Sequence, residues 1–288
     1  MLGMLSQIRS GWVREMSGHP FDLLMELDVH QVRLDCAALH LARDCYPDLH
    51  VVRYLKMLDA MAAEVGALRP GLAANLRYEA MRKVLVDQYG LTGNQNNYYH
   101  PDNCYLNRVL DTGVGIPITL SVAWVEVARR LKWTVAGVAL PGHFIVRFDD
   151  PERYILADPF YDGRALSISD CRRLVRRRFG TRMPFNRSYL RPVVSRGSLA
   201  RLLRNLRNVY LAANDWPRAA RILQRLTAME PKNGRHLQDL AAISYRLGNV
   251  RTACAHLQLY LNRQPNAHDS ELVRRSLKQL HAALASLN

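Results

Sequence analysis

Cysteine is scarce in this sequence, and no two cysteines form a CxxC or CxxH pair. The five that occur are Cys36, Cys45, Cys104, Cys171 and Cys254. An odd number at wide spacing argues against a disulfide scaffold and a zinc site, and predicts reduced thiols. No run of about 18 apolar residues is present, which excludes a membrane-spanning helix. The opening MLGMLSQIRSGWVREM lacks the apolar core and cleavage site of a secretory signal, so we expect a cytoplasmic protein.

Cofactor motifs are also missing. Gly113-Val114-Gly115 lacks the third glycine of a dinucleotide fingerprint and follows no expected strand, and no phosphate loop or kinase motif occurs. His100, Asp102 and His143 do not have the helical or hairpin spacing of metal ligands. We therefore expect neither a cofactor nor a metal.

Acidic residues are absent from one long stretch. No aspartate or glutamate lies between Asp170 and Asp215, whereas twelve arginines do, so that most of the net charge of +15 is concentrated at 171–214. One interpretation is a solvated helix and linker. The alternative is a surface for nucleic acid or another acidic partner. No membrane partner is expected.

What is present is typical of a folded protein of about two domains: 288 residues, 49% apolar and 23% charged. Apolar residues at three- and four-residue spacing predict helices over 21–47, 49–70 and 72–89. An Asn-rich loop, LTGNQNNYYHPDNCYLN, follows. PITLSVAWVEVARRLK then predicts a helix with Pro117 at its first position. The runs TVAGVAL, HFIVRF and RYILADPF predict an antiparallel meander, and hence an α+β domain with a small antiparallel sheet.

The C-terminal part carries a repeat of 34 residues. Aligning Pro231 with Pro265 pairs Asn214 with Gly248 and Ala219 with Ala253. Small residues at a helix crossing and a closing proline at this period are typical of tetratricopeptide repeats. An unrelated pair of helical hairpins is the alternative. The helix from about 269 to 287 would cap the stack. We expect a first domain at 1–195, with a helical N-terminal part, and an all-α repeat domain at 196–288.

His143 and Asp158 stand fifteen residues apart on neighbouring expected strands, which allows an antiparallel pair to place them side by side. The order of helix, histidine strand and aspartate strand resembles papain-like and transglutaminase-like folds. GIPITLSVAWVEVARRL, ALPGHFIVRF, ILADPF and NYYHPDNCYLNRVL together resemble the bacterial SirB-type proteins, which have a transglutaminase-like core and a tetratricopeptide tail. In the catalytic superfamily a cysteine opens the buried helix, the histidine acts as base, and the aspartate orients the imidazole.

The sequence departs from that pattern because the resemblance places Pro117 at the position of the catalytic cysteine. Thr119 and Ser121, on the same helix, are more typical of packing residues. Cys104 in the Asn-rich loop is a displaced-nucleophile candidate if the loop approaches His143. Without a nucleophile, His143 and Asp158 are either a structural pair or the polar floor of a ligand groove. Tyr98, Tyr99 and His100 fit a binding rim as well as ordinary loop packing.

Three functional hypotheses follow. The first is a non-catalytic interaction or regulatory protein. It would be a transglutaminase-like pseudoenzyme that binds a protein or peptide through its repeats and through the vestigial substrate groove of its core. The second is a cysteine hydrolase or acyl transferase that uses Cys104, His143 and Asp158. The third is binding of nucleic acid or an acidic partner by the arginine stretch.

Overall fold

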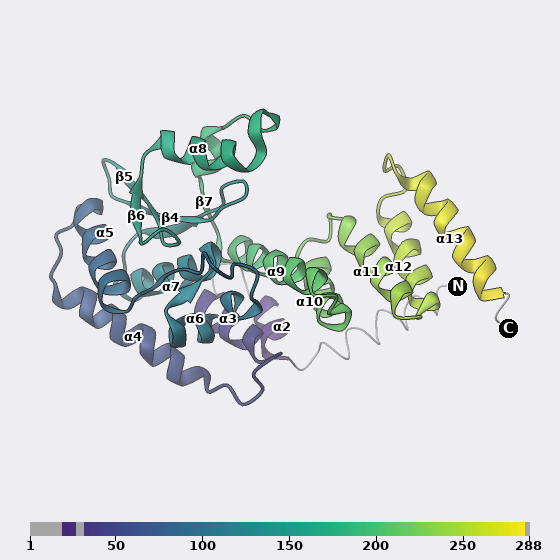
Figure 1. Ribbon diagram of the computed structural model, residues 1–288, viewed down its shortest axis with the longest axis horizontal. Helices are drawn as coiled ribbons and strands as arrows, with labels where there is room; N and C mark the ends of the chain where they lie inside the picture. Colours follow the sequence, from purple (N-terminus) through teal and green to yellow (C-terminus); the bar gives the residue numbers. More distant parts are fainter. Residues whose placement is uncertain (1–18, 27–31, 286–288) are drawn as a thin grey trace. The chain divides into compact units, whose positions relative to one another are not determined.

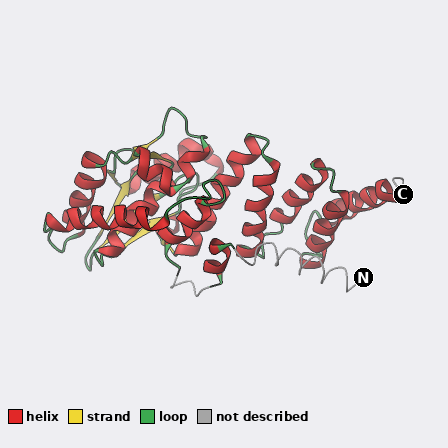
Figure 2. Cartoon of the chain, turned by 90° about the horizontal axis from the view of Figure 1, so that it is seen from below, coloured by secondary structure: helices red, strands yellow, loops and turns green. Residues whose placement is uncertain are grey.

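The computed structural model describes residues 19–26 and 32–285, so the N-terminal segment discussed above lies outside the described residues. The chain forms two compact units, 1–202 and 203–288 (Figure 1). Every strand of the described residues belongs to the first unit (Figure 2). The α+β class with an all-α C-terminal part is confirmed.

Helices form the first part of unit 1, as expected. They are α2 (Pro20–Met25), α3 (Leu34–Ala42), α4 (Val51–Ala67) and α5 (Ala74–Arg82). The run expected over 21–47 is thus divided between α2 and α3. The third run differs too, because α5 passes into a π-helical turn at Lys83–Gln88.

The Asn-rich segment is mostly irregular, in agreement with its composition. It contains the two-residue strand β1 (Thr92–Gly93) and a 3-10 turn at Pro101–Cys104, and it leads into α6 (Leu106–Thr112). β1 pairs in parallel with β2 (Val114–Gly115). The segment is therefore held against the residues that precede the next helix.

The helix α7 (Pro117–Arg130) begins at the expected proline and is buried along most of its length. The N–H that Pro117 lacks costs no hydrogen bond at this position, because the first N–H groups of a helix have no intrahelical acceptor. Three strands follow in the expected order: β3 (Val135–Val138), β4 (Ile145–Asp149) and β5 (Tyr154–Asp158). His143 is not within a strand, as the motif suggested, but in the turn before β4, because the strand begins at Ile145.

Two further strands complete the sheet: β6 (Arg164–Leu166) and β7 (Pro192–Val193). All five strands are antiparallel in the order β6-β5-β4-β3-β7. Successive side chains of β4 point to opposite faces of the sheet, and apolar side chains lie on both faces. Ile145 packs with the helix α8 (Ile168–Phe179), whereas Phe148 contacts Trp124 of α7. The sheet thus lies between α8 and α7, as Figure 1 shows.

The C-terminal helices have the expected repeat. They are α9 (Ser195–Ala212), α10 (Trp216–Met229), α11 (Arg235–Arg246), α12 (Val250–Arg263) and α13 (Ser270–Ala285). Asn214 and Gly248, paired by the 34-residue period, both have positive φ, at 57° and 77°. Ala219 and Ala253 are both fully buried. Equivalent turns and equivalent crossings show two successive helical hairpins, followed by α13.

In the described residues, no helix combines the length and the apolar character that crossing a membrane requires.

Candidate functional site

The sheet brings His143 and Asp158 together, as their spacing predicted. Nε2 of His143 lies 2.9 Å from each carboxylate oxygen of Asp158. Asp158 is fully buried at the end of β5, and its carboxylate also accepts the backbone N–H of Phe160 at 3.1 Å. The side chain of His143 is 13% exposed. The carboxylate therefore fixes one edge of the imidazole while the ring keeps contact with solvent.

This orientation determines which ring nitrogen is a base. A neutral imidazole facing a carboxylate through Nε2 carries its proton there and leaves Nδ1 as the acceptor. Within the described residues, all hydrogen bonds of the His143 ring go to Asp158. Nδ1 is thus available to accept a proton or a hydrogen bond from another group. This is the arrangement that a histidine–carboxylate dyad needs for general base catalysis.

Aromatic rings surround the imidazole. The ring of Phe160 lies edge-on to His143 and that of Tyr161 lies tilted against it, both with centroids 6.1 Å away. Tyr98 packs on Phe160 at 5.8 Å and on Tyr99 at 5.2 Å. Two tyrosines of the Asn-rich segment thus pack in one row with Phe160, a contact that fits ordinary loop packing as well as a binding rim.

Backbone hydrogen bonds attach the Asn-rich segment to this site. Gly93 N–H donates to the carbonyl oxygen of Phe160 at 3.0 Å, and Asn94 N–H donates to that of Gly115 at 3.0 Å. A Cβ atom on Gly93 would lie 2.3 Å from the Phe160 oxygen, so the approach requires glycine. These two consecutive residues attach the start of the segment both to the turn after β5 and to β2, which leads into α7.

Asn103 orders the same segment from within. Its side-chain amide is buried and donates to the carbonyl oxygens of Asn97 and Tyr98, while its side-chain oxygen accepts from Asn94. Its own carbonyl accepts the N–H of Ile116, which directly precedes Pro117. Asn103 is thus a positioning residue of the site. Its signal in the sequence is weak, because both partners of each bond lie in an irregular segment.

The position expected to hold the nucleophile is occupied by Pro117, buried at the first turn of α7. Proline offers no group that Nδ1 of His143 could activate. The two hydroxyls further along the helix do not replace it, since Thr119 and Ser121 are fully buried. Their hydroxyl oxygens have no hydrogen-bond partner in the described structure and lie within the packed core.

Cys104, the displaced-nucleophile candidate, lies at the end of the 3-10 turn and is 1% exposed. Burial raises the pKa of its thiol to about 12. No hydrogen bond joins Cys104 to His143 among the described residues. A buried thiol at this pKa is almost entirely protonated near neutral pH, whereas the thiolate is the nucleophile.

The candidate metal ligands are engaged elsewhere. Asp102 accepts the hydroxyl of Tyr46 at 2.6 Å and pairs with Arg108 at 3.0 Å, while His143 faces Asp158. Over the ranges that the structure describes, no three His, Cys, Asp or Glu side chains are grouped as metal ligands would be.

The arginine stretch does not form one surface element. It runs through α8, a 3-10 turn at Arg187–Leu190, β7 and the first part of α9. Arg178, at the end of α8, packs against the turn before His143, where a Cβ on Gly142 would lie 2.6 Å from its Cγ. The sequence did not indicate this contact, which joins α8 to the site.

Comparisons with known proteins agree with this architecture. Residues 52–204 match the family described as the transglutaminase-like superfamily, and residues 206–278 match a tetratricopeptide repeat. A UPF0162 protein of Xylella fastidiosa (strain 9a5c) is 36% identical over 267 residues, which cover 89% of this chain and 93% of the relative. A UPF0162 protein of Pseudomonas aeruginosa is 31% identical over 216 residues, covering 71% and 78% of the two chains.

The likeness extends in part to a longer protein. Human F-box only protein 21 is 34% identical over 105 residues, which are 34% of this chain and 17% of that protein. The Xylella fastidiosa match, by contrast, covers almost the whole of both chains, including both units of this one. The chain therefore belongs to the transglutaminase-like superfamily, among the SirB-like UPF0162 proteins that carry a tetratricopeptide repeat region.

Proposed function

We propose that this chain is a non-catalytic interaction protein, in which a transglutaminase-like unit without a nucleophile is joined to repeats that bind a protein partner. The family assignment supports the coarser part, since tetratricopeptide repeats serve as surfaces for peptide segments. The finer part, the loss of catalysis, rests on the geometry around His143.

The observation that carries the proposal is a dyad without a nucleophile. His143 and Asp158 keep the hydrogen bond that orients an imidazole base. The helix start that would present a thiol carries Pro117 instead. Nucleophilic catalysis needs the attacking group within hydrogen-bond reach of its base. On this interpretation, Nδ1 of His143 binds a group of a ligand and does not activate a thiol.

The rival function, a hydrolase or acyl transferase that uses Cys104, is less well supported. Its thiol is buried and has a pKa of about 12. A catalytic cysteine instead lies in an electropositive, partly exposed setting that lowers its pKa. Activity through Cys104 would therefore require the Asn103 network to open first.

The repeat unit offers a surface for the partner. Tyr245 on α11 is 57% exposed, although α11 packs between α10 and α12. An exposed tyrosine is the kind of amphipathic side chain that anchors protein interfaces.

We place the interaction in the cytoplasm, a proposal supported by five cysteines of which none is in a disulfide.

The test compares alkylation of the thiols in the native chain and in a His143→Ala variant. Iodoacetamide labelling from pH 6 to 9, followed by peptide mass spectrometry, gives a rate for each cysteine. We expect every rate, including that of Cys104, to be unchanged within about twofold, because no thiolate depends on His143. A His143-dependent rate at Cys104 below about pH 8 would support the hydrolase instead.

A further inference from the structure

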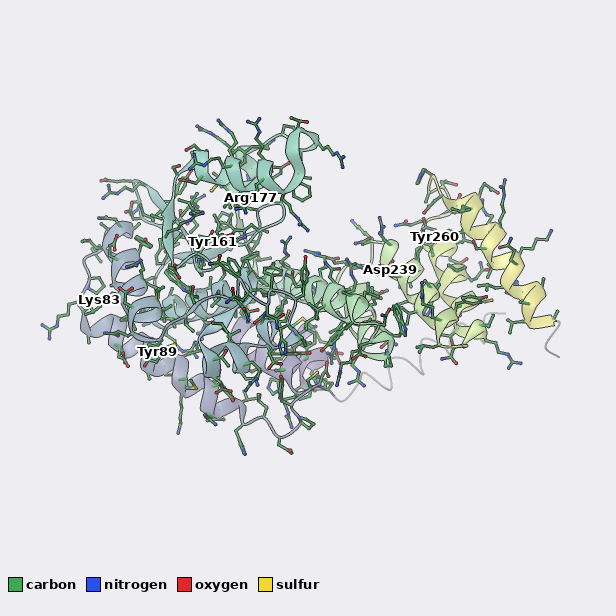
Figure 3. All side chains as sticks on the ribbon, in the orientation of Figure 1. Lys83, Tyr89, Tyr161, Arg177, Asp239 and Tyr260 are labelled. Carbon is green, nitrogen blue, oxygen red and sulfur yellow. The ribbon has the colours of Figure 1, made fainter. Side chains whose placement is uncertain are left out.

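A pocket of about 540 Å³ lies against α8, and arginines form most of its lining. Its residues are Arg164, Asp170, Arg173, Leu174, Arg176 and Arg177. Arg164 comes from β6 and the others from α8, which follows it closely in the chain. Figure 3 shows Arg177 on this helix and many nitrogen-tipped side chains around it. The His143–Asp158 dyad and the repeat unit do not contribute to the lining.

The one carboxylate of this pocket is already used. Asp170 accepts the backbone N–H and the hydroxyl of Ser167, which caps α8, and it forms an ion pair with Arg173. Asp170 pairs directly with Arg173 and also interacts electrostatically with Arg164, but its one charge offsets only one of the four guanidinium groups in the lining. Three positive charges are thus in excess, and the guanidinium groups besides that of Arg173 belong to Arg164, Arg176 and Arg177.

Each of these three groups is held or exposed in a way that favours an incoming anion. The guanidinium of Arg164 lies over the ring of Tyr161, 4.8 Å from its centroid. Arg176 and Arg177 are exposed on α8 and form no ion pair within the described residues. Uncompensated positive charge around a concave surface raises the local concentration of anions.

We propose that this pocket binds a peptide segment rich in aspartate and glutamate. The planar guanidinium group matches a carboxylate with two parallel hydrogen bonds. Leu174 and the methylene stems of the arginines provide apolar contact for the side chains that carry those carboxylates. The volume falls within the usual range of ligand pockets and accommodates a few side chains of an extended segment.

Two other occupants fit the surface less well. Single-stranded nucleic acid binds by stacking its bases on exposed aromatic rings, whereas no aromatic side chain lines this pocket. A membrane-binding helix presents large apolar side chains. Among the described residues, the stretch between Tyr154 and Val194, which contains the pocket, exposes no large apolar side chain.

The experiment uses the full chain and a fluorescein-labelled hexapeptide of alternating glutamate and aspartate, titrated by fluorescence anisotropy at about 0.1 M salt, where charges beyond about 10 Å are screened. The test variant is Arg176→Gln with Arg177→Gln. The matched control is Arg187→Gln with Arg191→Gln, which removes the same charge from exposed positions that do not line the pocket. Circular dichroism melts confirm that both variants fold.

We expect the test variant to raise the peptide Kd by about tenfold or more, and the control by less than about twofold, because only the first removes charge-assisted hydrogen bonds. An equal loss in both variants, or no binding of the peptide, would overturn the proposal. So would tighter, Arg176/Arg177-dependent binding of a DNA oligonucleotide or of phosphatidylserine vesicles than of the peptide. These readouts do not depend on His143, so their failure is separate from that of the proposed function.

Discussion

At the residue scale, the chemistry of the site depends on Pro117. Backbone geometry tolerates proline at the first position of α7, and its buried ring fills the space at the helix start. The imidazole of His143 is still oriented through Nε2 by a buried carboxylate. On the proposed mapping of the family site, one side chain rather than a rearranged fold separates this site from a Cys-His-Asp triad.

Replacing Pro117 with cysteine tests this mapping of the family site. We expect the new thiol to titrate below the free value of about 8.5, because it stands at a helix N-terminus and, on this mapping, beside His143. The folding cost should stay within about 1 kcal/mol, since residue 117 needs no helical acceptor for its N–H. The measurement is the rate of alkylation, against pH, of the peptides that span position 117, with the native chain as blank.

Two variants serve as controls for that measurement. Adding His143→Ala to Pro117→Cys should move the thiol pKa back toward 8.5. Ser121→Cys, one turn further along the buried helix, should titrate above 8.5, because burial raises the pKa of a thiol and this position is away from the helix N-terminus. A thiol at position 117 that titrates at or above 8.5 would mean that His143 and Asp158 are not directed at this position.

Sequence patterns predicted the dyad but not its support. The fifteen-residue spacing of His143 and Asp158 indicated their contact, and the structure has it at 2.9 Å, although His143 lies in the turn before β4 and not on a strand as expected. Gly93 and Asn103 carry no such signal. Their roles depend on hydrogen bonds between irregular segments, such as Gly93 to Phe160, and no periodicity encodes such a contact.

At the element scale, two buried carboxylates join α3 to α7. Glu126 of α7 accepts the backbone N–H of Leu34, which begins α3, at 3.0 Å. Asp35, fully buried, accepts hydrogen bonds from Arg33 and Arg130 at 2.8 Å each. Burial and the charge of Asp35 raise the pKa of Glu126. The cluster fixes the N-terminal helices against the helix that carries Pro117.

We expect Asp35→Asn to lower the free energy of unfolding at pH 7 by about 3 kcal/mol, because it removes the fully buried charge that pairs with Arg33 and Arg130, and leaves Arg130 with only Glu126 and Asp59 as partners. The matched control is Asp59→Asn, whose side chain is 63% exposed and pairs with the same Arg130. It should cost under about 1 kcal/mol. Urea unfolding of the three chains measures both differences. Equal costs would contradict the role of burial.

The same cluster predicts a pH dependence. Burial alone would raise the pKa of Asp35, but hydrogen bonds from Arg33 and Arg130 outweigh it and lower that pKa to about 2. A carboxyl whose pKa is depressed in the folded state stabilises the fold fully at any pH above its pKa in the unfolded chain. That contribution is lost as the pH falls toward the pKa in the folded state. The stability gap between native chain and Asp35→Asn should shrink by about 2 kcal/mol between pH 5 and pH 2. A constant gap would exclude this linkage.

A glycine fixes how the Asn-rich segment meets the sheet. Gly93→Ala forces its Cβ against the Phe160 carbonyl oxygen, and we expect a loss of about 2 kcal/mol in stability. Gly197→Ala is the matched control. That position is helical, and its new Cβ would lie 3.6 Å from Val193, so it should gain up to about 1 kcal/mol. Thermal melts of both variants measure these changes in stability. An equal effect of the two would show that the close approach is unimportant.

Long elements were easier to predict than short ones. The helix from Pro117 and the three strands of the meander follow from apolar periodicity. β6, β7 and the β1–β2 pair were missed, because strands of two or three residues exist only through their partners in the sheet. The π-helical turn at Lys83–Gln88 was missed as well, since its sequence continues the helical pattern of α5.

At the scale of the whole molecule, α9 belongs to both units. The two compact units divide at Leu202, within this helix, and the sequence-based boundary at residue 195 falls at its start. Ser198, at the start of α9, lies beside Gly137 of β3, and Leu199 and Leu202 are buried. We therefore propose that 195–202 completes the transglutaminase-like unit, a boundary that the composition of the stretch could not reveal.

Two truncated chains test this boundary. A chain ending at Leu202 keeps Leu199 and Leu202, the buried leucines of α9 that belong to the first unit, and we expect it to unfold cooperatively. A chain ending at Val194 should be less stable by about 3 kcal/mol or more, because two buried leucine side chains are lost. Urea titrations give both values. Equal stabilities would place the boundary at residue 195 instead.

The chain ending at Leu202 also tests the division of function between the units. If the repeats bind the protein partner, this chain should lose the proteins that the full chain recovers by affinity purification, while its own fold is retained. A full chain with Tyr245→Arg should lose the same proteins, because it places a charge on the exposed face of α11. Gln258→Arg, at an exposed position of α12, adds the same charge and should recover them. Identical recovery by the full chain and the chain ending at Leu202 would assign the docking surface to the transglutaminase-like unit, where the arginine pocket and the His143 site would then be the candidates.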